Sequence, residues 1–96
     1  MKLSEIVANL DQTDEDWTIF ADRSAPVGPD TPAQVASAEG EADDGLQYLL
    51  EVYLAKEAVD VWSLWRNGRK PSLTEACKAV IWYAEHDAYM PLEPDS

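Results

Sequence analysis

The chain has 96 residues and a formal net charge of -12, because 19 aspartates and glutamates outnumber 7 lysines and arginines. This excess of negative charge argues against non-specific nucleic-acid binding and against docking on anionic lipid, since both require positive charge. Hydrophobic residues make up 46% of the chain and include four tryptophans and four tyrosines, which argues against an entirely disordered acidic protein. The length predicts a single domain over residues 1–96.

Cys77 is the only cysteine, which excludes an intramolecular disulfide and a cysteine-rich zinc site. No apolar run is long enough for a transmembrane helix. Polar residues also interrupt the N-terminal apolar residues, where a secretory signal would be continuously apolar. We therefore expect a cytoplasmic protein that does not associate with membranes.

The N-terminal half predicts one short helix and two strands. Residues 2–10 form the helix, because apolar residues recur there at helical spacing: Leu3, Ile6, Val7 and Leu10. Residues 17–21 are β-branched and aromatic and predict a strand, and residues 33–37 predict a second one. The stretch between them, 23–32, contains three prolines and a glycine and predicts a loop.

The segment over residues 46–66 admits two interpretations. Alternating apolar residues over 46–54 favour a strand, but the apolar residues also fit one long helix that would make the fold all-α. The acidic, glycine-containing stretch over 39–45 resembles a hairpin connection. We therefore favour a strand over 46–54 followed by a helix over 56–67.

Short sequence patterns mark the end of that helix and the start of the next one. Gly68 occupies the position of a helix C′ glycine, and Arg66 suits the negative end of the helix dipole. Ser72 and Glu75 have the spacing of a capping box and begin a last helix that runs to about Asp87. The tail over 91–96 contains two prolines and is expected to fray.

Together these elements predict an α+β fold. A small antiparallel sheet of about three strands would pack against a C-terminal helix pair, with a short helix at the N-terminus.

Catalytic and metal-binding patterns are not evident in the sequence, so we predict no enzyme activity, no cofactor and no metal site. Cys77 and the single histidine, His86, are nine residues apart on one predicted helix, about 13 Å along its axis at ~1.5 Å per residue, too far apart for a catalytic dyad. Cys77 instead fits the apolar core. A calcium loop centred on Gly45 fails, because Gly40 and Ala42 occupy positions that require carboxylates.

Negative charge is concentrated in residues 1–60, which hold 14 acids and 3 bases, against 5 acids and 4 bases in residues 61–96. Most aromatic rings are expected in the core, but one or two on the last helices are candidates for an exposed binding anchor. The candidate partner-binding residues are two acidic clusters and two rings: Asp11, Asp14, Glu15 and Asp16; Glu39, Glu41, Asp43 and Asp44; Trp82 and Tyr89.

A resemblance to a known class of proteins covers residues 46–90. A strand, a helix that ends in a polar turn and a helix that closes on a tyrosine–aspartate pattern carry it: Trp65-Arg66-Asn67-Gly68, then Tyr83-x-x-x-Asp87-Ala88-Tyr89. This arrangement resembles small bacterial proteins that are similar to immunity proteins of contact-dependent inhibition. The resemblance implies a cytoplasmic antidote that blocks a toxin domain. It implies no specific binding residues.

The charge predicts a small acidic binding protein with a basic protein partner, such as a toxin nuclease, because opposite charges steer association. Two alternatives remain open. An acidic nucleic-acid mimic would block a DNA-binding defence enzyme, and would need rows of carboxylates at phosphate-like spacing. An accessory subunit would use its charge for solubility.

Overall fold

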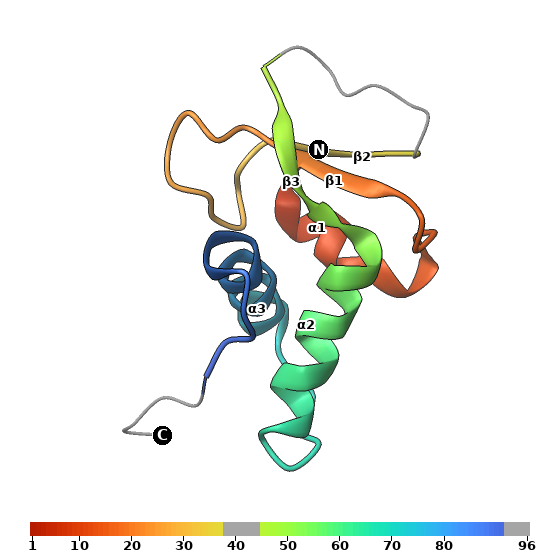
Figure 1. Ribbon diagram of the computed structural model, residues 1–96, viewed down its shortest axis with the longest axis vertical. Coiled ribbons are helices and arrows are strands. Elements are labelled where there is room, and N and C mark those ends of the chain that lie inside the picture. Colours follow the sequence, from red (N-terminus) through yellow and green to blue (C-terminus); the bar gives the residue numbers. More distant parts are fainter. Residues whose placement is uncertain (38–44, 92–96) are drawn as a thin grey trace.

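The chain folds as a three-stranded antiparallel sheet with one short helix before it and two longer helices after it (Figure 1). The computed structural model describes residues 1–37 and 45–91. In chain order the elements are α1 (Leu3–Ala8), the 3-10 turn η1 (Leu10–Gln12), β1 (Thr18–Ala21), β2 (Ala33–Ala36), β3 (Gln47–Glu51), α2 (Val52–Leu64) and α3 (Leu73–His86). The predicted α+β class is confirmed, and the all-α alternative is wrong because residues 47–51 pair with β1.

The strand order is β2-β1-β3, so β1 is central. Ile19 pairs with Val35 on one side and with Leu50 on the other, and this row faces the helices. The pairing of β1 with β3 shifts between Ile19 and Phe20, which leaves Leu49 as an extra residue on β3. This bulge turns two consecutive leucines inward, so that Leu49 and Leu50 are both buried.

The observed boundaries of β3 and α2 differ from the predicted ones. The strand ends at Glu51 and not at residue 54, and the helix begins at Val52 and not at residue 56. No turn separates the two elements. The backbone N–H of Val52 instead donates to the carbonyl of Trp17, 2.9 Å away, which satisfies one of the free donors at the start of α2.

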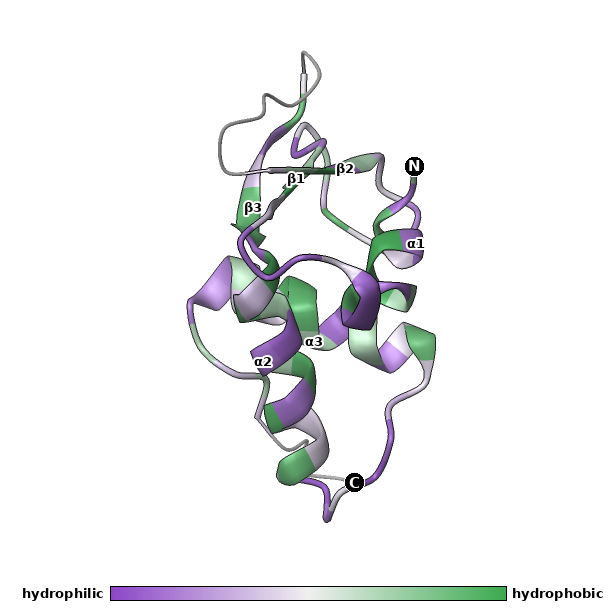
Figure 2. Cartoon of the chain, turned by 90° about the vertical axis from the view of Figure 1, so that its right-hand side faces the viewer, coloured by the Kyte–Doolittle hydropathy of each residue, from purple (hydrophilic) through white to green (hydrophobic). Residues whose placement is uncertain are grey.

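The start of α2 therefore depends on a contact with a distant part of the chain. Along α2, hydrophilic and hydrophobic residues alternate (Figure 2), as expected for a helix with one buried face.

α1 contributes more to the core than its six residues suggest, because it contacts both β2 and α3 (Figure 1). The helix predicted over residues 2–10 ends at Ala8, but all four apolar residues of its stripe are buried: Leu3, Ile6 and Val7 in α1, and Leu10 in η1. They pack in one cluster with Ile19 and Leu50 of the sheet and with Cys77 and Val80 of α3. The prediction that Cys77 belongs to the core is confirmed.

The chain before α1 is tied to the end of the β1–β2 loop. The carbonyl of Met1 accepts from the N–H of Ala33 at 2.7 Å, and the N–H of Leu3 donates to the carbonyl of Thr31 at 2.9 Å. Lys2 forms an isolated antiparallel bridge with Pro32. These bonds hold a helix that would be too short to be stable alone.

The connection between α2 and α3 differs in part from the prediction. α2 ends at Leu64, three residues earlier than expected, so Gly68 lies beyond the helix terminus. Gly68 still adopts a left-handed conformation, with φ of 79°, and its N–H donates to the carbonyl of Ser63 at 2.8 Å. Arg66 Nη1 donates to the carbonyl of Trp62 at 3.0 Å, which agrees with its predicted role at the helix end.

The capping box of α3 is confirmed. The N–H of Glu75 donates to Ser72 Oγ at 3.2 Å, and the N–H of Ser72 donates to Glu75 Oε1 at 3.0 Å. Arg69 also binds Glu75, with Nη2 3.0 Å from Oε2. The Ser72 N–H and then the Arg69 guanidinium lower the pKa of the Glu75 carboxyl to about 2. α3 ends at His86, with Asp87 in a left-handed conformation at its C-cap.

Candidate partner-binding site

The first acidic cluster lies on η1 and on the turn that leads into β1. Its four residues are exposed, and Asp14 accepts the N–H of Asp16 at 2.9 Å. Glu15 Oε1 lies 3.8 Å from Nζ of Lys56 on α2, and the same ammonium donates to the carbonyl of Thr13 at 2.8 Å. Asp11, Asp14 and Asp16 have no ion-pair partner within residues 1–37 and 45–91. The cluster therefore keeps most of its negative charge.

Trp17 adds an aromatic ring to this cluster, directly after Asp16. The strand was predicted to begin at Trp17, but β1 begins one residue later and the ring is 39% exposed. Its backbone is held at both ends, because its N–H donates to the carbonyl of Asp14 at 3.1 Å and its carbonyl accepts from Val52. An exposed ring on a restrained backbone suits a binding anchor.

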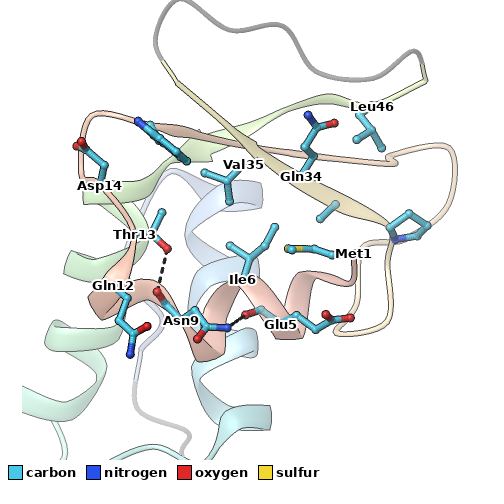
Figure 3. Close-up of a pocket in the computed structure, with 13 residues that line it drawn as sticks. Met1, Glu5, Ile6, Asn9, Gln12, Thr13, Asp14, Gln34, Val35 and Leu46 are labelled. Carbon is cyan, nitrogen blue, oxygen red and sulfur yellow. Dashed lines mark hydrogen bonds between the residues drawn. The ribbon is translucent and has the colours of Figure 1, made fainter.

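Beside Trp17, an apolar groove of about 730 Å³ is lined by residues of both α1 and β2 (Figure 3). The side chains of Ile6 and Val35 extend into it from opposite sides, and the exposed Met1 lies along it. Glu5 and Asp14 are the acidic members of its lining. The volume is within the range of ligand-sized clefts, so the groove can accept apolar side chains from a partner.

Polar groups along α1 and η1 keep this side of the groove in place. Asn9 Nδ2 donates to the carbonyl of Glu5 at 2.8 Å, and Thr13 Oγ1 donates to the carbonyl of Asn9 at 2.8 Å (Figure 3). These two bonds occupy backbone acceptors at the end of α1, where the helix itself leaves carbonyls free. The groove is thus largely preformed, which reduces the ordering cost of binding.

The other predicted site residues lie elsewhere. Trp82 is half-buried on α3 and stacks on the exposed His86, with ring centroids 4.0 Å apart. The hydroxyl of Tyr89 donates to Glu57 of α2, whereas the first cluster contacts α2 through Lys56. Consecutive helical residues point about 100° apart, so these contacts lie on different sides of α2.

The second acidic cluster lies outside the described residues: Glu39, Glu41, Asp43 and Asp44. The tail that was predicted to fray also lies outside them from residue 92 onward. Pro91 is described, and its carbonyl accepts from Arg66 Nη2 at 3.1 Å.

The aromatic rings are more exposed than the sequence predicts. Of the rings on α2 and at its C-cap, Trp62 is buried, Trp65 is 44% exposed and Tyr53 is 49% exposed. The core is filled instead by aliphatic residues and alanines. The exposed rings are therefore available for contacts with other molecules.

Two observations concern the nucleophilic and metal-binding side chains of the described residues. Cys77 is fully buried, and burial raises the pKa of its thiol, which disfavours the reactive thiolate. No group of three or more histidine, cysteine, aspartate or glutamate side chains within residues 1–37 and 45–91 could hold a metal ion. The geometry of the acidic cluster and the groove suits binding.

Comparisons with known proteins give no match to a family model, to a curated protein or to a solved structure. Within the described residues, no helix has the length and apolar character that crossing a membrane requires.

Proposed function

We propose that this protein binds and neutralises a basic protein partner, in the manner of immunity proteins that block toxin domains, and that a toxin nuclease is the class of partner. The observation that carries the proposal is the acidic cluster beside the apolar groove. Asp14 and Asp16 supply charge without an ion-pair partner among the described residues, and Trp17 and the groove supply apolar contact area next to them.

The two features would act at different stages of binding. Uncompensated carboxylates attract a cationic partner over distances near the Debye length, about 8–10 Å at moderate salt, and raise the association rate. The ring and the groove exclude water after contact and slow dissociation, as buried aromatic anchors do. Such a protein acts by occupying its partner's surface and needs no catalytic residues.

The proposal is tested by affinity capture from the native cells, with the captured proteins identified by mass spectrometry. The bait is compared with a variant that carries Asp14→Asn and Asp16→Asn. A matched control carries Asp30→Asn and Glu85→Gln, which remove the same charge from exposed positions that do not line the groove; Asp30→Asn also removes the exposed ion pair with Lys2. We expect a basic protein that the wild type and the control retain and that the first variant loses.

Binding kinetics measured with the captured protein then distinguish the contribution of the acidic cluster from that of Trp17 and the groove. The association rate should fall from about 10⁸ toward about 10⁶ M⁻¹s⁻¹ as salt rises, and the Asp14/Asp16 variant should show a weaker salt dependence. Trp17→Ala should weaken binding by about 10- to 30-fold, mainly through faster dissociation. A neutral or acidic partner, or an association rate that is independent of salt, would refute the proposal. Capture of no protein would favour the accessory-subunit alternative.

A further inference from the structure

The four tyrosines of the chain lie on β3, at the start of α2 and around the end of α3, and electrostatic interactions link both Tyr48 and Tyr83 to Tyr53. Tyr83 and Tyr89 have ring centroids 5.3 Å apart, and Tyr89 meets Trp65 edge-on at 6.1 Å. Tyr48 is on the face of the sheet opposite Ile19 and Leu50, and α2 follows directly from β3. We define the tyrosine face as the four tyrosines and two glutamates: Tyr48, Tyr53, Tyr83, Tyr89, Glu51 and Glu57.

Each glutamate of the tyrosine face accepts a hydrogen bond from a phenol. The hydroxyl of Tyr48 donates to Glu51, and the hydroxyl of Tyr89 donates to Glu57. Neither glutamate forms an ion pair with a lysine or arginine in the described part of the chain. The carboxylates are thus oriented by neutral donors, and their charge remains uncompensated.

The pKa values of the two tyrosine hydroxyls are consistent with negative charge close to them. Burial and the Glu51 carboxylate raise the pKa of Tyr48 to about 12, and the hydrogen bond to Glu57 raises the pKa of Tyr89 to about 12. Negative charge near a phenol disfavours its ionised form. The same negative potential would attract a cation to the face.

The chain already holds two of its own arginines against an aromatic ring, and one of them, Arg69, also binds a carboxylate. The guanidinium carbons of Arg66 and Arg69 lie 4.3 and 4.7 Å from the ring centroid of Trp62, and Arg69 also makes two hydrogen bonds to Glu75. A guanidinium is suited to both contacts at once, because its flat faces stack on rings while its edge donates to a carboxylate.

The tyrosine face presents the same pair of groups on one helix without an arginine between them. Tyr53 and Glu57 are four residues apart on α2, so their side chains are neighbours, about 5–6 Å apart at Cβ. Tyr53 is 49% exposed and Tyr48 is 50% exposed, which leaves aromatic surface accessible to a partner.

We propose that the tyrosine face recognises arginine side chains of a basic protein partner, with the guanidinium stacked on Tyr53 and hydrogen-bonded to Glu57. This inference rests on the proposed function, because it assumes a basic partner. It assigns a second contact surface, separate from the acidic cluster and groove. Lysine is a weaker match, since its ammonium has no flat face and cannot donate in a fork.

The test uses the full chain, labelled with nitrogen-15, and two capped peptides of alternating glycine with either arginine or lysine, four cations in each. Titrations are followed by NMR at about 0.15 M salt, where contacts between distant surface charges are screened. Two indole N–H signals report the two surfaces, because Trp65 contacts Tyr89 whereas Trp17 follows the acidic cluster. We expect the arginine peptide to shift the Trp65 signal and the amides of residues 53–57, and to bind about fivefold more tightly than the lysine peptide.

Variants identify the groups responsible. Tyr53→Ala and Glu57→Gln should each weaken binding of the arginine peptide by about two- to fivefold. Tyr53→Phe, which keeps the ring, should retain the affinity. Glu85→Gln removes one charge from α3 outside the tyrosine face and should also retain it.

Equal affinity for the two peptides, or shifts confined to Trp17 and residues 11–16, would overturn the inference. Neither result would affect the proposed function, whose test depends on the captured partner and on Asp14 and Asp16. Conversely, a partner that fails to depend on the acidic cluster would refute the proposed function, even with arginine binding at the tyrosine face intact.

Discussion

Replacing Leu3 with alanine should destabilise the protein strongly, although Leu3 lies two residues from the N-terminus, where chains often fray. Leu3 is fully buried in the cluster that joins α1, the sheet and α3. Removing a buried leucine side chain costs about 2–5 kcal/mol, because apolar contacts are lost and a cavity remains. A protein of 96 residues has a total stability of about 5–14 kcal/mol, so Leu3→Ala would remove a large fraction of it.

Urea denaturation followed by tryptophan fluorescence measures this change. With a slope of about 1–1.5 kcal/mol/M, a loss of about 3 kcal/mol lowers the midpoint by about 2–3 M. The matched control is Leu64→Ala, because Leu64 is 73% exposed and its removal should change the stability by less than about 0.5 kcal/mol. If both variants changed the stability equally, α1 would not be part of the core and the packing described above would be wrong.

Four further measurements probe the C-terminal half. Ser72→Ala should cost about 1 kcal/mol in urea denaturation, whereas Ser72→Thr should retain most of the cap. The pKa of Glu75 is lowered to about 2 in the folded state, so its contribution to stability is complete above pH about 4.5 and is lost as the pH falls toward 2. In Glu75→Gln, the free energy of unfolding measured from pH 6 to 2 should therefore fall less steeply with decreasing pH than in the wild type. Gly68→Ala should cost about 1 kcal/mol through backbone strain alone, because no atom lies within 4 Å of the added methyl group. Cys77 should be alkylated only as fast as the protein opens, and a native-state rate equal to that of the unfolded chain would contradict its burial.

Local signals in the sequence were sufficient for the elements whose ends depend on neighbouring residues. The capping box of Ser72 and Glu75 marks the start of α3 because its donors and acceptors are three residues apart. The stripe of α1 follows from helical spacing in the same way. In both cases the pattern that reveals the element consists of residues within it or directly beside it.

The boundary between β3 and α2 could not be found in this way. Glu51 at the N-cap makes no side-chain cap, and the carbonyl that accepts from Val52 belongs to Trp17, far away in the sequence. The bulge at Leu49 also breaks the alternation on which the strand prediction rested. A strand that continues directly into a helix leaves no turn residues for the sequence to reveal.

The candidate binding surfaces were predictable only in part. The charge of the first acidic cluster is evident in the sequence, but the groove beside it forms only when α1 packs next to β2. Tyr53 and Glu57 share a helical face because α2 begins at Val52, whereas the predicted strand over 46–54 includes residue 53 and conceals this spacing. The approach of Tyr48 and Tyr89 to that face depends on the tertiary structure.

The pairing of α1 with α3 joins nearly the first and nearly the last residues of the described chain in one core. Such contacts span most of the sequence, so they form late and require almost the whole polypeptide. Neither end can detach without exposing the apolar side of the other. Amide hydrogens in α1 and α3 should therefore exchange with solvent through a common opening of the whole molecule, with little independent fraying at either end.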